Sequence, residues 1–200
     1  YKEGLVDGII SYGGSMGATI ATSIMKELPI GVPKFMLTTM ASGDVRSYIG
    51  TKDITLMYPL AEAGLNRVTK EILARAAAGV VAMSKKPKVD LEDSKPLVGC
   101  MMFGVTTPCV LKATELIDEA GKYDVIINHA TGAGGRSIEE MIAEGFIEGF
   151  LDITTSELCD EHFGGVLSAG AERCSSASIN KIPQGIAPGG LDIINFGAEN

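Results

Sequence analysis

The sequence predicts an α/β fold with two Rossmann-like, three-layer domains whose sheets are mostly parallel. Apolar runs with the composition of strands alternate with stretches of helix-forming residues, which is the pattern of parallel crossover units. Glycine accounts for 25 of the 200 residues, above the usual ~7%, as expected for many tight turns between strands and helices. At ~150 residues per domain, this length suits one domain or two small ones.

Three strands and two helices are expected in the first half of the chain. The strands are the apolar runs at 5–12, 33–40 and 53–58, and a polar loop at 41–52 separates the last two. One helix spans 18–28, after a break rich in glycine. The other begins after Asn66, whose side chain can cap a helix, and runs to about Met83.

The second half repeats this alternation. The expected strands are 97–104, 123–129, 149–153 and 193–196. The expected helices are 108–120, with Thr107 as its cap, 136–144 and 156–163.

A charge-rich segment at 85–95 has no face that could pack, and it is the expected linker. Residues 1–84 are then the carboxyl-terminal part of a first α/β domain, and residues 96–200 are a second, incomplete at its carboxyl end. The chain opens at Tyr1 without Met, just before an apolar run, so it is expected to be a fragment.

Composition excludes several classes of function. The chain has 25 Asp and Glu against 17 Lys and Arg, a net charge of −8, which argues against nucleic-acid binding. Neither a transmembrane helix nor a secretory leader is readable, and the four cysteines form no CxxC pair. We therefore expect a cytoplasmic protein with reduced thiols, no membrane or nucleic-acid partner and no dedicated metal site.

The glycine-rich turn at 13–19 is the first candidate site. It lies where a strand ends and a helix begins, so free N–H groups and the helix dipole could bind a phosphate. The residues assigned to this role are Gly13, Gly14, Ser15, Gly17 and Thr19. The turn lacks the Lys of a Walker A motif, and it could instead serve only to pack the helix on the sheet.

Asp44 and Arg46 form a second candidate, also assigned to cofactor binding. They follow the carboxyl end of the second strand, which is the edge where open α/β sheets bind ligands. A carboxylate and a guanidinium there could contact a cofactor, or they could form a solvated loop pair of little consequence.

His129 is the most specific local signal. It ends a buried strand and precedes a glycine-rich turn, which places a titratable base next to an anion cradle. The residues assigned to bind an anionic substrate are Thr131, Gly132, Gly134, Gly135 and Arg136. The alternative is a structural imidazole.

Glu157 and Asp160 follow the next strand and are three residues apart on a helix. With His129 they could form a catalytic acid–base set or hold a divalent cation. The simpler interpretation is an acidic first turn that complements the helix dipole.

These motifs resemble an uncharacterised protein family that contains the amino-terminal, ATP-binding-like domain of the tomato mosaic virus resistance protein. The matching stretches of the first half are 13–19, 28–34, 41–46 and 53–58. Those of the second half are 129–132, 134–136, 151–158, 164–170 and 192–197. The resemblance covers nearly the whole chain and is poorest in the linker.

The resemblance implies two α/β domains and nucleotide binding, with ATP as the expected ligand. Mg²⁺ is a further expected ligand, and a homo-oligomer is the expected assembly. A different reading from the residues is an enzyme acting on a small anionic substrate, with His129 as general base. A third is a regulatory protein that acts by binding a partner.

Overall fold

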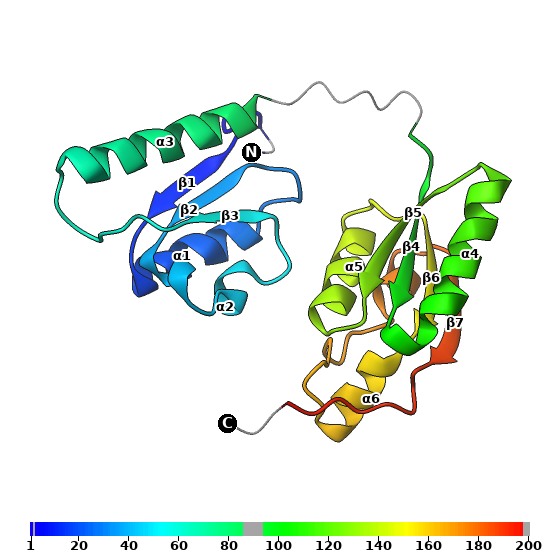
Figure 1. Cartoon of the computed structure of the whole chain (residues 1–200). Helices are drawn as coiled ribbons and strands as arrows, with labels where there is room; N and C mark the ends of the chain where they lie inside the picture. The colour runs from blue at the N-terminus through cyan, green and yellow to red at the C-terminus, as the bar shows by residue number, and fades with distance from the viewer. Residues whose placement is uncertain (2, 86–93, 198–200) are drawn as a thin grey trace. The chain divides into compact units, whose positions relative to one another are not determined.

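The chain divides into two units, Tyr1–Val89 and Asp90–Asn200 (Figure 1). This computed structural model describes residues 1, 3–85 and 94–197. Most of the expected linker, residues 86–93, lies outside the described residues. Both units are α/β with parallel strands, as the sequence predicts.

Unit 1 is built on a three-stranded parallel sheet in the order β1-β2-β3. The strands are β1 (Ile9–Tyr12), β2 (Lys34–Leu37) and β3 (Ile54–Met57). All four residues of the central strand are buried, which explains its uninterrupted apolar run. Each strand lies within its predicted range.

Two long helices cover opposite faces of this sheet (Figure 1). Met36 packs in one cluster with α1 (Ser15–Lys26), and Phe35 and Leu37 pack in another with α3 (Arg67–Ser84). This split follows from the alternation of side chains along β2. The predicted cap is confirmed, because Asn66 Oδ1 accepts hydrogen bonds from two backbone N–H groups of the first turn of α3.

The loop expected at 41–52 contains short helical segments instead. A 3₁₀ turn, η1 (Thr39–Ser42), follows β2, and the four-residue helix α2 (Arg46–Ile49) comes before β3. Neither segment is long enough to show an apolar period in the sequence.

Unit 2 is built on a four-stranded parallel sheet in the order β5-β4-β6-β7. The strands are β4 (Leu97–Met102), β5 (Asp124–His129), β6 (Gly149–Thr154) and β7 (Gln184–Gly189). The chain runs outward from β4 to β5 and then crosses back to β6, so the strand order reverses between β4 and β6.

Helices lie on both faces of this sheet (Figure 1). They are η2 (Gly104–Thr106), α4 (Thr107–Ala120), α5 (Ala133–Ala143), α6 (Ser156–Phe163) and α7 (Ser176–Ile179). The main core lies under α5, where Ile138 and Ile142 pack on Met101 and Phe150. Thr107 is the first residue of α4 and Thr106 its cap, one residue from the prediction.

The prediction of a last strand at 193–196 is wrong. The final strand is β7, whose sequence Gln-Gly-Ile-Ala-Pro-Gly has too much Gly and Pro to be recognised. Residues 193–196 form an irregular segment, and Asn195 is bound there by the side chain of Asp160. In addition, α5 begins at Ala133, three residues before the predicted start at Arg136.

Among the described residues, no helix is both long enough and apolar enough to cross a membrane.

Candidate functional site

The loops that follow β1, β2 and β3 meet at the carboxyl edge of the sheet in unit 1. Gly13 donates its N–H to Leu37 O at 3.0 Å, which ties the glycine-rich turn to the end of β2. The Tyr12 hydroxyl donates to Ala61 O at 2.7 Å, which ties the end of β1 to the loop after β3. This edge is therefore a single surface.

The amino end of α1 opens onto this surface. Gly14 is its N-cap and has no side chain to satisfy the N–H groups of the first turn. Ser15 is exposed beside it. The hydroxyl of Thr19, predicted to contact a phosphate, instead donates to Ser15 O at 2.9 Å within the helix. The backbone N–H groups, rather than Thr19, are the donors that the turn offers.

Glu62, which the sequence did not single out, stands next to this turn. A Cβ placed on Gly14 would lie 3.0 Å from Glu62 Oε1, and the same oxygen accepts a hydrogen bond from the Thr39 hydroxyl. A carboxylate is thus held beside the amino end of a helix. It follows β3 in an irregular loop, so no sequence pattern could have placed it there.

Asp44 and Arg46 lie after β2 and bind each other. Arg46 Nε donates to Asp44 Oδ1 at 2.9 Å, and Arg46 Nη2 donates to Asp44 Oδ2 at 2.5 Å. The side-chain hydrogen bond from Arg46 lowers the pKa of Asp44 to about 2. Both side chains are exposed, so the structure gives them a local pairing, and their role in cofactor binding stays a prediction.

In unit 2, His129 lies at the carboxyl end of β5, as predicted, but its side chain is exposed and β5 is an edge strand rather than the buried strand expected. Its ring centroid is 5.4 Å from that of Phe103, at the end of β4. Arg136 lies on α5 and donates from Nη1 to Ser168 O at 2.9 Å. The structure therefore places His129 and Arg136 on neighbouring elements and gives Arg136 an acceptor within the chain.

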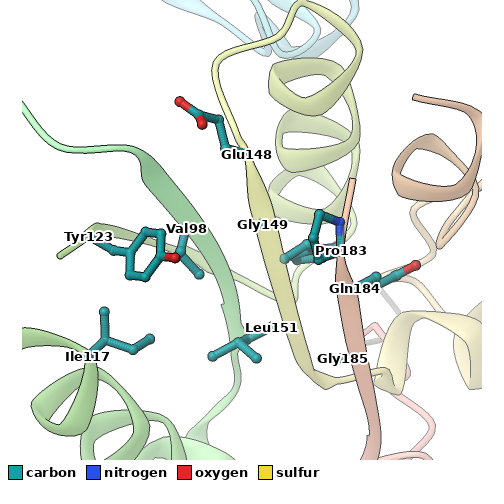
Figure 2. A pocket seen from close by; sticks show the side chains of 10 residues that line it. Val98, Ile117, Tyr123, Glu148, Gly149, Leu151, Pro183, Gln184 and Gly185 are labelled. Atoms are coloured by element: carbon teal, nitrogen blue, oxygen red, sulfur yellow. The ribbon is translucent and has the colours of Figure 1, made fainter. Parts of the chain in front are cut away.

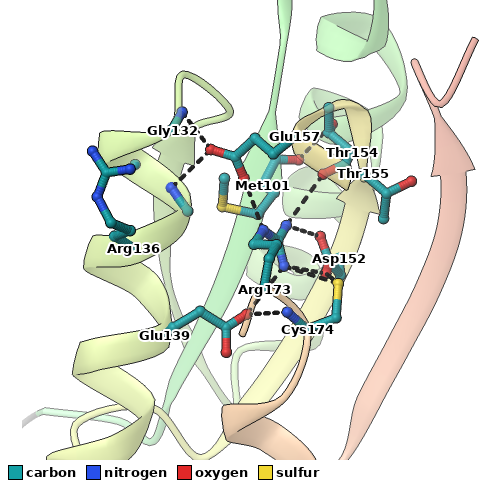
Figure 3. A network of polar contacts seen from close by, with 12 residues as sticks. Met101, Gly132, Arg136, Glu139, Asp152, Thr154, Thr155, Glu157, Arg173 and Cys174 are labelled. Atoms are coloured by element: carbon teal, nitrogen blue, oxygen red, sulfur yellow. Dashed lines mark hydrogen bonds and ion pairs between the residues drawn. The ribbon is translucent and has the colours of Figure 1, made fainter. Parts of the chain in front are cut away.

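The predicted anion cradle after β5 already holds an anion of the protein itself (Figure 3). Glu157 Oε1 accepts hydrogen bonds from the backbone N–H groups of Gly132 at 2.6 Å and Gly135 at 3.1 Å. Thr131 donates its hydroxyl to His129 O at 3.3 Å, and Gly134 O accepts a bond from Asn128. The turn has the predicted geometry, with Glu157 in the place of a ligand.

Arg173 holds the carboxylate of Glu157 in place and also binds two other carboxylates (Figure 3). The Arg173 cluster consists of Arg173, Glu139, Asp152 and Glu157. The guanidinium of Arg173 has five N–H groups, and they make five contacts with oxygen. Nε donates to Glu157 at 2.8 Å, Nη1 to Glu139 at 3.2 Å and to Asp152 at 2.7 Å. Nη2 donates to Asp152 at 2.6 Å and to Thr154 O at 3.4 Å.

Burial and neighbouring charges together set the pKa values in and beside this cluster. Burial alone would lower the pKa of Arg173, but its hydrogen bonds to Asp152 and Glu157 outweigh burial and raise that pKa. Burial and the charge of Asp152 raise the pKa of the neighbouring Cys174 thiol to about 12. Cys174 is therefore a protonated thiol near neutral pH and no nucleophile there.

Asp160 has a separate task. Its two carboxylate oxygens accept hydrogen bonds from the N–H and the side-chain amide of Asn195, at 2.7 and 2.8 Å. Glu157 and Asp160 are both fully buried, and each is bound by a different part of the chain. Among the described residues, no group of three or more His, Cys, Asp or Glu could hold a metal ion, so these carboxylates are not gathered with His129 into such a site.

Unit 2 also has an apolar groove of about 430 Å³ on one face of its sheet (Figure 2). It runs past the amino-terminal ends of β4, β6 and β7, and Ile117 and Tyr123 form one wall. Ligands of open α/β sheets bind at the other, carboxyl ends. The groove is therefore not the site towards which the loops of this unit point.

Comparison with known proteins identifies the family. The model of the uncharacterised protein family (UPF0261) N-terminal domain matches residues 1–89, and the model of its C-terminal domain matches residues 95–200. The chain belongs to the UPF0261 family. This confirms the resemblance drawn from the sequence motifs.

Curated members of the family extend well beyond this chain. It is 49% identical to a UPF0261 protein of Clostridium tetani over 98% of its length and 48% of the relative's. It is 43% identical to one of Rhizobium meliloti, with 96% and 48% covered. It is 40% identical to the ToMV resistance protein Tm-1(GCR237) of Solanum lycopersicum, with 95% and 26% covered. The chain thus spans about half the length of the two bacterial relatives and about a quarter of the length of the tomato protein.

Proposed function

We propose that this chain binds a nucleotide, ATP with Mg²⁺, at the carboxyl edge of the sheet in unit 1. The observation that carries the proposal is the amino end of α1, which opens on that edge with Gly14 as a cap that lacks a side chain. Unsatisfied N–H groups and the helix dipole attract phosphate, and a glycine lets the ligand approach the backbone closely.

The distribution of charge supports unit 1 over unit 2 as the site for an anion. Residues 1–89 contain 11 Lys and Arg against 7 Asp and Glu, a net charge of +4. Residues 90–200 contain 6 against 18, a net charge of −12. A strongly negative unit repels an anion, whereas a positive one raises its local concentration.

The carboxylate of Glu62 is the reason for including Mg²⁺. A carboxylate beside a phosphate repels it, unless a divalent cation lies between them. Mg²⁺ in proteins is commonly bound by one or two carboxylates together with phosphates of the substrate. Mg-ATP should therefore bind more tightly than free ATP.

Unit 2 does not support the alternative of an acid–base enzyme to the same degree. The carboxylates assigned to assist His129, Glu157 and Asp160, are buried and bound to other parts of the chain. His129 as a general base remains a prediction, and so does the homo-oligomer.

Calorimetric titration of the chain with ATP and with Mg-ATP tests the proposal. Gly14→Val should abolish binding, because it fills the cradle while φ at this position, −74°, suits any residue. Ser23→Val is the matched control: Ser23 is exposed on the same helix, remote from its amino end, and this variant should bind as the wild type does. Absence of saturable binding, or equal binding by both variants, would refute the nucleotide site.

A further inference from the structure

A cavity in unit 1, of about 420 Å³, lies along the first half of α3. Its lining residues are Leu60, Arg67, Val68, Glu71, Ile72 and Arg75. This volume lies in the range of ~300–1,000 Å³ that small-molecule sites occupy. Buried Ile72 contributes apolar surface to it, and Arg67 and Arg75, both on α3, contribute guanidiniums.

Arg67 differs from the other arginines of the chain. Arg46, Arg75, Arg136 and Arg173 each donate to an oxygen of the protein. Within the part of the chain that the structure describes, Arg67 has no such acceptor. A guanidinium has donors arranged to grip a planar oxyanion, so an unpaired one in a cavity offers a binding group.

The net charge of the cavity wall indicates the charge of the ligand. Arg75 Nη2 donates to Glu71 Oε2 at 3.2 Å, so these two charges offset each other. One positive charge, that of Arg67, is left over. A group with a single negative charge, such as a carboxylate, matches it.

Leu60, another lining residue, is apolar and has an unusual backbone conformation. Leu60 has a φ of 64°, a left-handed conformation that is rare for a leucine, and its side chain is 65% exposed. Such outliers gather at ligand sites, where the surrounding structure holds them. Leu60 and Val68 present apolar surface next to Arg67.

We infer that this cavity binds a small monocarboxylate with an apolar body. The guanidinium of Arg67 binds the carboxylate, and the side chains of Leu60, Val68 and Ile72 contact the body. This site does not depend on nucleotide binding at Gly14.

Sodium benzoate is the probe, titrated into the isotope-labelled chain and followed by NMR shifts of backbone amides. Benzoate should give saturable shifts along α3, and neutral benzamide of the same shape should bind at least about tenfold more weakly. Arg67→Gln should weaken benzoate binding by a similar factor. Arg46→Gln, which removes another exposed arginine of the same unit, should leave it unchanged.

Equal binding of benzamide and benzoate, or equal benzoate binding by Arg67→Gln and the wild type, would overturn the inference. So would the absence of saturable shifts. Titration with phenyl phosphate tests whether the cavity prefers a phosphate to a carboxylate. Tighter binding of phenyl phosphate than of benzoate would show a phosphate site instead. Arg67 is exposed, so a melting curve is expected to confirm that Arg67→Gln remains folded.

Discussion

Glu157 and Arg173 are joined by a hydrogen bond of 2.8 Å between Oε2 and Nε, and neither side chain is exposed. The other oxygen of Glu157 accepts the N–H groups of Gly132 and Gly135. One carboxylate thus links a buried guanidinium to the amino end of α5. The turn after β5, which the sequence suggests as a ligand site, is therefore occupied by a carboxylate of the chain itself.

Removing this carboxylate should destabilise unit 2. Glu157→Gln is expected to lower the free energy of unfolding by about 1–3 kcal/mol, because a side-chain NH₂ cannot accept the hydrogen bond from Arg173 Nε and leaves this buried donor without a partner. Urea unfolding followed by circular dichroism measures the change. Glu119→Gln, an exposed substitution on α4, should stay within about 0.5 kcal/mol of the wild type, and similar losses in both variants would contradict a structural role for Glu157.

Two glycines in the first turns of helices should respond in opposite ways to alanine. A Cβ on Gly134 would overlap the carbonyl oxygen of His129, so Gly134→Ala should lower stability by about 1–3 kcal/mol. A Cβ on Gly17 would meet only Tyr12 O, at 3.9 Å, so Gly17→Ala should raise stability by about 0.5–1 kcal/mol. Melting temperatures of the two variants measure these changes in stability. Changes of the same sign would contradict the contacts expected for a Cβ at the two positions.

The left-handed conformation of Leu60 predicts an unusual gain from glycine. Leu60→Gly should raise the free energy of unfolding by up to about 1 kcal/mol, because glycine adopts a positive φ without the steric cost that a side chain incurs. Leu65 is exposed in the same loop and is not among the residues with positive φ, so Leu65→Gly serves as the control and should not stabilise. Thermal unfolding compares the two, and an unchanged or lower melting temperature for Leu60→Gly would argue against strain.

Alkaline pH should weaken unit 2 through its buried thiols. Burial and the charge of Asp152 raise the pKa of Cys100 to about 11 and that of Cys174 to about 12, from an ordinary 9.0. The unfolded chain therefore loses these protons first, so stability is full below pH 9 and falls as pH rises towards 11–12. Denaturation at several pH values measures the fall. Cys174→Ala should reduce its slope, whereas Ser178→Ala, at an exposed position that does not titrate, should not.

Glu62 should control the dependence of nucleotide binding on Mg²⁺. Glu62→Gln removes the negative charge beside Gly14, so it should raise the affinity for free ATP. The affinities for ATP and for Mg-ATP should then differ less than in the wild type. Titrations in the presence and absence of EDTA measure this difference. Glu27→Gln, an exposed change at the other end of α1, should keep the wild-type difference.

Local signals in the sequence account for most of the architecture. The strand β2 and the cap at Asn66 could be predicted because an apolar run and a side chain one turn away determine them. The strand β7 could not, since Gly185, Pro188 and Gly189 hide its pairing with β6. Pairing between strands distant in sequence leaves no local pattern.

The candidate sites were predicted in part for the same reason. His129 and Gly14 could be located because a strand that ends at a glycine-rich turn is a local feature. The Arg173 cluster could not, because its carboxylates come from α5, β6 and α6. From the sequence, Glu157 was assigned to a catalytic set with His129 or, more simply, to an acidic first turn of its helix. The structure bonds its carboxylate to the turn after β5 and to Arg173.

The five contacts of Arg173 also constrain how this family can evolve. Lysine offers three donors from a single nitrogen, so it cannot replace a guanidinium that binds three carboxylates and a carbonyl. Losing any one carboxylate leaves a buried donor without a partner. Arg173, Glu139, Asp152 and Glu157 are therefore expected to be inherited as a set, and descendants that lose one member should have replaced the others along with it.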